Sequence, residues 1–146
     1  MMGGSAGSKR KSRELALKAL FAWDALGDMD LAMANQIVQD GSAEPDVRQR
    51  ALEMASGAWQ ERDGIDRWLN RLAPQWPTPR QPGVDRNLLR LAVWELTNLD
   101  TPPKVVLDEA IELAKAFSTE QSPSFVNGVL DAVLTEHQAK TAPGAS

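Results

Sequence analysis

The side chains in this sequence that could carry out catalysis do not form a catalytic pattern. The chain has one histidine, His137, and no cysteine, which excludes disulfides, zinc–thiolate sites and cysteine nucleophiles. Three carboxylates, Asp108, Glu109 and Glu112, are grouped as acid–base pairs can be. Lysines flank them at the spacing of helical ion pairs, which favours a solvated polar helix face. The sequence therefore predicts a binding protein, with no enzymatic activity, cofactor or metal.

A basic segment near the N-terminus offers a different chemistry. Between residues 9 and 18 a single glutamate accompanies five basic side chains: Lys9, Arg10, Lys11, Arg13 and Lys18. The segment thus carries a net charge of +4 within a chain of net charge −4. Clustered cations suit a nucleic-acid backbone, because each neutralised phosphate releases counterions. An ordinary solubilising terminus would show the same pattern, and the two interpretations remain open on composition alone.

The elements that must position these residues are helices. Apolar residues recur at helical spacing in about seven segments, and no strand alternation is evident, which predicts an all-α fold. The first helix is expected to begin at Ser12 and end at Gly27. The third is expected to begin at an Asp46 N-cap and to end at a break at Asp63–Gly64. Residues 84–99 are apolar around most of the helix circumference, which predicts a buried central helix.

Composition also suggests how the chain is organised. We expect one helical domain over residues 9–137, made of two packed sub-bundles at 9–73 and 84–137. The connecting loop, 74–83, is rich in proline and cannot be helix interior. Gly/Ser-rich residues 1–8 predict a disordered tail, and 138–146 a flexible one. No apolar stretch approaches the length of a membrane helix, and no apolar core follows the basic N-terminus as it would in a signal peptide. A cytoplasmic protein without membrane contact is therefore expected.

Three stretches resemble the NusB family of bacterial transcription antitermination factors. They are RELALKALFAWD at 13–24, VDRNLLRLAVWEL at 84–96, and PPKVVLDEAIELAKAF at 102–117 followed by SFVNGVLD at 124–131. The resemblance runs from about residue 9 to 136 and implies that family's seven-helix fold. The same fold also forms the N-terminal domain of a ribosomal-RNA cytosine methyltransferase. Because the chain ends at Ser146 without a catalytic domain, the free-standing factor is expected.

The resemblance implies a function as well as a fold. Members of the family pair with NusE, a small-subunit ribosomal protein, and bind single-stranded boxA RNA. With other Nus factors they act on elongating RNA polymerase, notably on ribosomal-RNA operons, without catalysing a reaction. A homodimer is a possible second assembly. Two alternatives remain: an RNA-binding accessory of a ribosomal-RNA methyltransferase, and a helical protein-interaction module with no RNA role.

Carried over residue by residue, the resemblance implies two sets of site residues. The RNA-binding set is Lys9, Arg10, Lys11, Arg13, Lys104, Phe125 and Asn127. Lys9 and Lys11, the two lysines of this set in the basic segment, favour phosphate contacts over bidentate base contacts. Phe125 could stack a base or pack in the core, and Asn127 could bond a base edge or cap a loop. The NusE-binding set is Phe21, Asp85 and Trp94, of which Trp94 is also a candidate core residue.

Gly128 needs an explanation of its own, because glycine inside a helix costs about 1 kcal/mol relative to alanine. Lacking a Cβ, it could let a neighbouring helix or the RNA backbone approach closely. Helix–helix contact is the favoured interpretation.

Overall fold

A computed structural model describes residues 5–141 of the chain, and every regular element in that range is helical. This confirms the predicted all-α fold with seven α-helices, to which the structure adds one short 3-10 helix. The elements are α1 (Ala6–Leu26), α2 (Leu31–Gly41), α3 (Pro45–Gln60), α4 (Arg62–Leu72), η1 (Thr78–Arg80), α5 (Gly83–Asn98), α6 (Pro103–Phe117) and α7 (Ser122–Thr141).

Helix α1 begins earlier than its apolar periodicity predicts. Ser5 is the N-cap, and its hydroxyl accepts a hydrogen bond from the Ser8 backbone N–H at 3.1 Å. Residues 6–8 are therefore helical, which differs from the expected disordered tail, while residues 1–4 lie outside the described range. The other end is as expected: Gly27 has a φ of 90°, a left-handed conformation that glycine adopts without strain.

The other predicted boundaries differ by two to four residues. Glu44 is the N-cap of α3, and Pro45 at the first helical position supplies a backbone angle that suits the helix. Asp46, the predicted N-cap, lies in the first turn. The break between α3 and α4 falls at Glu61, and Gly64 is inside α4. Helix α7 runs to Thr141, past the expected start of a flexible tail at 138, and residues 142–146 are outside the described range.

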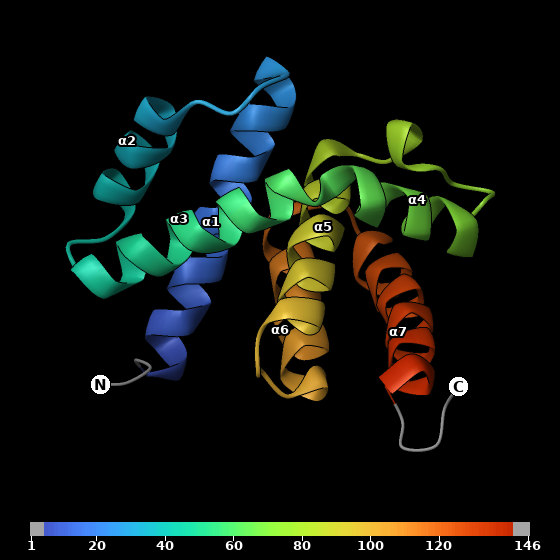
Figure 1. The fold of residues 1–146 in the computed structure, drawn as a ribbon. Coiled ribbons are helices and arrows are strands. Elements are labelled where there is room, and N and C mark those ends of the chain that lie inside the picture. Colours follow the sequence, from blue (N-terminus) through green and yellow to red (C-terminus); the bar gives the residue numbers. More distant parts are fainter. Residues whose placement is uncertain (1–4, 142–146) are drawn as a thin grey trace.

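Helix α5 is the centre of the fold (Figure 1), as its apolar circumference predicts. It packs against α1 and α3 on one side and against α6 and α7 on the other. Its buried residues include Leu88, Leu89 and Leu91, each at most 2 % exposed. Helix α4 belongs to the N-terminal half of the sequence but packs on α7 and α5 as well as on α3. The two halves of the chain are therefore interlocked through α4.

Close approach of α3 to α5 depends on Gly57. A Cβ at Gly57 would overlap the ring of Trp94, so only glycine leaves room for the indole. The indole N–H of Trp94 donates a hydrogen bond to the Glu61 carboxylate at 3.1 Å. Trp94 thus packs against α3 and the α3–α4 junction. None of the helices between residues 5 and 141 combines the length and apolar character needed to cross a membrane.

Candidate nucleic-acid interface

Three cations of the basic segment lie on the surface of the first turns of α1. Lys9 and Arg10 are exposed, and Lys11 is partly exposed. The Lys11 ammonium pairs with Glu14 at 3.1 Å. Lys9 forms no ion pair with any residue between 5 and 141. These positions place the lysines where a polyanion can reach them.

Arg10 is exposed but already has an anionic partner. Its Nε and Nη2 donate to the two carboxylate oxygens of Glu109 on α6 at 2.9 and 2.7 Å. The hydrogen bond from Arg10 holds the pKa of Glu109 below its ordinary value, against a smaller effect of burial, and the charge of Arg13 adds to it. Glu109 therefore stays ionised at neutral pH. The side chain of Arg10 remains 61 % exposed, so a phosphate can reach its outer edge.

Arg13 differs from its three neighbours because it is buried. Its Nε and Nη2 donate to the Glu95 carboxylate at 2.8 and 2.7 Å, and Thr101 donates to the same carboxylate at 2.7 Å. Arg13 and Glu95 are 6 % and 2 % exposed. Although burial opposes the charged form of Arg13, its hydrogen bonds to Glu95 and the charges of Glu95 and Glu109 outweigh that cost and raise its pKa. Arg13, which the sequence predicted to bind RNA, thus joins α1 to α5 in the structure.

Lys104 joins the surface cations at the same end of the molecule. It lies in the first turn of α6, with a side chain 85 % exposed, and pairs with Asp108 at 3.1 Å. Its neighbour Val105 lines the same cavity as Lys9, which places the start of α6 beside the start of α1. We call Lys9, Arg10, Lys11 and Lys104 the basic end.

Phe125 and Asn127 lie elsewhere. Ser122, at the start of α7, donates to Asp85 near the start of α5, whereas Arg13 meets Glu95 ten residues further along α5. Ten helical residues correspond to about 15 Å. Phe125 and Asn127 are near the start of α7, so the structure does not bring them together with the basic end.

The surroundings of Phe125 and Asn127 bear on the alternatives left open for them, namely core packing for Phe125 and loop capping for Asn127. Phe125 is partly buried, with its ring centroid 4.5 Å from that of Trp76 in the proline-rich segment. Asn127 is exposed and caps no loop among the hydrogen bonds of residues 5–141. Gly128 is exposed too, and a Cβ there would meet nothing within 4 Å. The favoured explanation for Gly128, contact with another helix, is therefore wrong for the described part of the chain.

Of the three candidates for binding a partner protein, Phe21 and Asp85 lie near the start of α5 and Trp94 lies further along it. Phe21 is 45 % exposed and lies over the start of α5, since a Cβ on Gly83 would come within 2.9 Å of its ring. Asp85 is fully buried and accepts hydrogen bonds from Ser118 and, at 2.9 Å, from Ser122. Asp85 therefore stabilises the α6–α7 turn and does not reach the surface. Trp94 packs on α3, away from Phe21.

A second exposed ring accompanies Phe21. Phe117 continues the helical spacing of the buried residues Ala110, Leu113 and Ala114, yet it is 40 % exposed because it is the last residue of α6. The Lys18 ammonium lies 5.6 Å from the centroid of its ring. Lys18 is also one helical turn before Phe21, so α1 and α6 present both phenyl rings around one lysine. We call Phe21 and Phe117 the aromatic pair.

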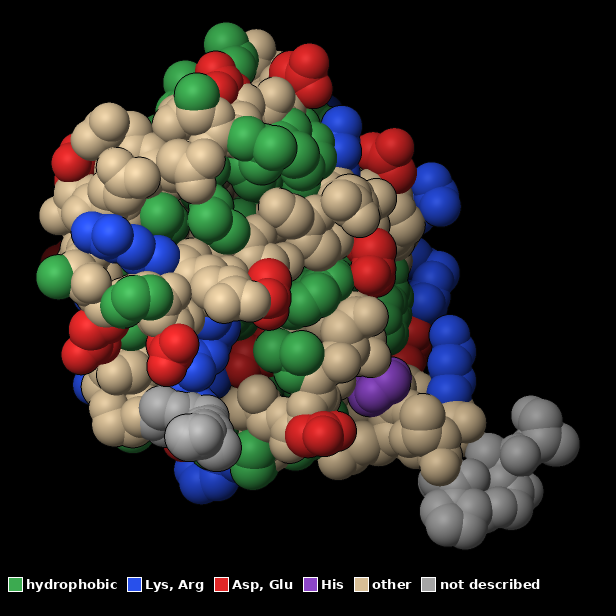
Figure 2. All heavy atoms as spheres, turned by 60° about the vertical axis from the view of Figure 1, so that its left-hand side comes forward, with side chains coloured by type: hydrophobic (Ala, Val, Ile, Leu, Met, Phe, Trp, Pro, Cys, Tyr) green, Lys and Arg blue, Asp and Glu red, His purple; other side chains and the backbone are tan. Residues whose placement is uncertain are grey.

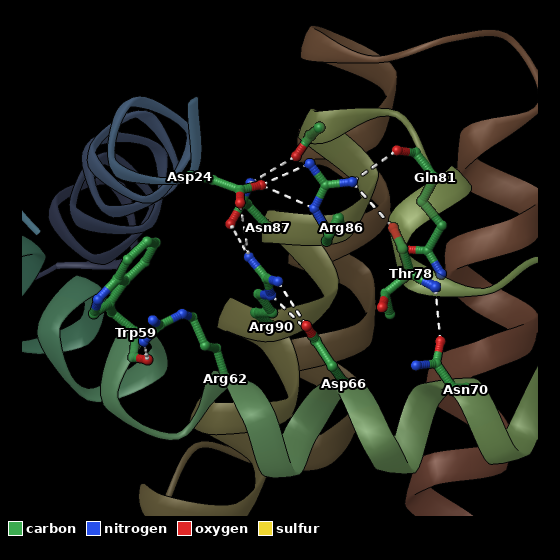
Figure 3. A network of polar contacts seen from close by, with 11 residues as sticks. Asp24, Trp59, Arg62, Asp66, Asn70, Thr78, Gln81, Arg86, Asn87 and Arg90 are labelled. Carbon is green, nitrogen blue, oxygen red and sulfur yellow. Dashed lines mark hydrogen bonds and ion pairs between the residues drawn. The ribbon is translucent and has the colours of Figure 1, made fainter. Parts of the chain in front are cut away.

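A polar network that the sequence did not reveal holds this end of α1 in place (Figure 3). Asp24 accepts hydrogen bonds from Arg86 and Asn87, each at 2.8 Å. Burial raises the pKa of Asp24, but these hydrogen bonds and the charge of Arg90 outweigh it, and the pKa falls below its ordinary value. Arg90 also pairs with Asp66 on α4 at 2.6 Å. The network fixes α1 against α4 and α5, three residues beyond Phe21.

One face of the molecule mixes charges. The face in Figure 2 carries basic and acidic side chains side by side, with an apolar area in its upper half. Acidic residues and the histidine come together nowhere between residues 5 and 141 in a group of three or more able to hold a metal ion. The candidate binding surfaces are therefore separate: the basic end, the start of α7 with Phe125 and Asn127, and the aromatic pair.

Comparisons with known proteins identify the relatives of this chain. The NusB family profile matches residues 10–135. The transcription antitermination protein NusB of Solibacter usitatus is 42 % identical over 142 residues, covering 94 % of this chain and 96 % of the relative. That of Symbiobacterium thermophilum is 44 % identical over 138 residues, covering 87 % and 89 %.

Solved structures agree with the sequence relatives. NusB of T. maritima superimposes with a TM-score of 0.77 at 34 % identity, covering 92 % of this chain and 94 % of the other. A chain from a crystal structure of the antitermination factors NusB and NusE in complex with double-stranded RNA gives a TM-score of 0.81 at 26 % identity, covering 90 % and 99 %.

Proposed function

This chain belongs to the NusB family, and we propose that it is a transcription antitermination factor that binds RNA together with NusE. The observation that carries the RNA part is the basic end, where three surface cations of α1 lie beside Lys104 of α6. The function is binding and not catalysis. It takes place in the cytoplasm, on RNA polymerase during elongation, notably on ribosomal-RNA operons.

The basic end binds the RNA backbone. Lys9 meets phosphate without breaking an existing ion pair, whereas Arg10 shares its guanidinium between Glu109 and phosphate or exchanges one for the other. Lys104 exchanges its exposed partner Asp108 at little cost. Lys11 leaves the partly buried Glu14, which keeps its ion pair with Lys18. Sequence preference for single-stranded boxA then has to come from base contacts, since phosphate contacts carry no sequence information.

Phe125 and Asn127 extend the RNA surface at the other end of the molecule. Trp76 covers part of the Phe125 ring, and the partly exposed remainder can stack on an unpaired base. Exposed Asn127 can reach a base edge, and the open space above Gly128 admits the RNA backbone. RNA that touches both ends must span roughly the length of α5.

The proposal is tested by fluorescence anisotropy of a labelled boxA RNA and a scrambled RNA, with and without NusE, across a salt series. We expect tighter binding of boxA in the presence of NusE and a steep loss of affinity with salt. Equal and weak binding of both RNAs, unaffected by NusE, would refute it. An accessory of a methyltransferase would bind RNA without a response to NusE, and a pure protein-interaction module would bind NusE but neither RNA.

NusE docks on the aromatic pair in this proposal. Replacing Phe21 with alanine is expected to weaken NusE binding about tenfold or more, as the loss of a large interface ring does. Because Phe21 is 45 % exposed, thermal stability should change little. Isothermal titration of NusE measures the effect.

A matched control is Leu31→Ala, which removes a side chain 57 % exposed from α2, a helix that carries neither ring of the aromatic pair. If both variants bind NusE as the parent does, the aromatic pair is not the docking surface.

A further inference from the structure

A cavity of about 500 Å³ opens beside the basic end, between the start of α1, the middle of α3 and the α5–α6 turn. Its size falls within the range of small-ligand pockets. Neither the sequence patterns nor the role proposed for the basic end accounts for it. The pocket has an apolar wall, a polar floor and a charged rim, and the apolar wall and the charged rim point to the same ligand.

The first wall is apolar and open to solvent. Leu99 and Val105 are 41 % and 40 % exposed, although both are large apolar side chains, and buried Met54 lies behind them. Exposed apolar side chains that line one recess favour a flat, largely apolar group inside it.

The second wall is a fixed polar floor. The buried Arg13–Glu95 pair lines the cavity, and Thr101 donates to Glu95 at 2.7 Å. Because these groups satisfy one another, the floor keeps its shape whether or not the cavity is filled.

The third wall is a charged rim. Lys9, Arg50 and Asp100 line the cavity, and none of the three forms an ion pair with any residue from 5 to 141. Arg50 donates one hydrogen bond, to Ser12 at 3.3 Å, and its guanidinium keeps further donors. Two cations without carboxylate partners fit a phosphodiester, and the acceptor-only carboxylate of Asp100 fits an amino group.

We propose that this cavity receives one unpaired nucleobase of the bound RNA. The base inserts between Leu99 and Val105, its flanking phosphate lies on Lys9 and Arg50, and Asp100 accepts a hydrogen bond from an exocyclic amino group. The inference rests on the proposed RNA-binding function, and it gives the basic end a means of reading sequence. Adenine, cytosine and guanine carry such an amino group, whereas uracil does not.

The test couples a change in the protein to a change in the RNA. A set of labelled boxA RNAs, each with one abasic nucleotide, is titrated against the parent and against Val105→Trp, which fills the cavity from an exposed wall. In the parent, one abasic position should cost about tenfold in affinity, the worth of one good base contact. In Val105→Trp the intact RNA should bind about tenfold more weakly, and the penalty at that position should vanish.

Two further variants make the result decisive. Leu99→Trp fills the cavity from the end of α5 and should behave as Val105→Trp does, which covers the case in which one of them fails to fold. Leu31→Trp, on an exposed site of α2, should keep the parent's pattern. If the abasic penalties are the same in the parent and in the folded cavity variants, the inference is overturned while RNA binding by the basic end stands. If the parent itself binds none of the RNAs, the proposed function fails and this inference with it.

Discussion

Replacing Arg13 with alanine is expected to lower the free energy of unfolding by about 3–5 kcal/mol, the cost of removing one partner of a buried ion pair. The substitution would leave the carboxylate of Glu95, which is 2 % exposed, with Thr101 as its remaining hydrogen-bond donor among residues 5–141. It would also remove two of the hydrogen bonds that join α1 to α5. Because the whole stability of a domain is commonly 5–15 kcal/mol, the loss would be plain in urea denaturation followed by circular dichroism.

A double variant separates the buried charge from the lost packing. Arg13→Met combined with Glu95→Leu removes both charges and keeps apolar volume, so it should recover most of the stability lost in Arg13→Ala. A loss below about 1 kcal/mol in Arg13→Ala would show that the pair is solvated and not buried. The outcome also decides how RNA-binding data on Arg13 variants are to be interpreted, since unfolding alone would abolish binding.

Neutralising the surface part of the basic segment should have the largest effect on RNA affinity. In the triple variant Lys9→Gln, Arg10→Gln, Lys11→Gln we expect the slope of log affinity against log salt to fall by about two, at roughly 0.7 for each lost phosphate contact with a single strand. Affinity at moderate salt should fall roughly a hundredfold, at about 1 kcal/mol per contact. Stability should hardly change, because these side chains are exposed or partly exposed.

The matched control removes the same charge from another surface. Arg67, Arg71 and Lys140 lie on α4 and α7, and Arg71 pairs with Glu136 at 2.7 Å as Arg10 pairs with Glu109. Changing these three to glutamine should leave the salt slope close to that of the parent. If the control loses as much affinity as the basic-segment variant, binding follows net charge and has no defined site.

The helices were largely predictable because each carries a periodic apolar face, and α5 was recognisable as central from its apolar circumference. The start of α1 was not predictable, because residues 6–8 have weak helical composition and their helical conformation depends on the cap formed by the Ser5 hydroxyl. Phe117 continues the apolar spacing of α6, but it is exposed because the helix ends there.

The partners of charged residues could not be predicted from local sequence. Arg13 resembles its basic neighbours along the chain, yet Glu95, 82 residues away, takes it into the interior. Asp85 is the acidic residue opening α5, and Ser118 and Ser122 enclose it from 33 and 37 residues away. Such pairings depend on how helices pack, and a single sequence does not record them.

The position of α4 has a consequence for synthesis of the chain on the ribosome. Helices α1, α2 and α3 contact one another and can assemble as they emerge. Helix α4 emerges next, but Trp68 and Arg71 on it bond to Glu136, close to the end of α7. Helix α4 therefore completes its contacts only after nearly the whole chain has been translated. A nascent chain that stalls before α7 leaves the Trp68 face of α4 without its partner helix.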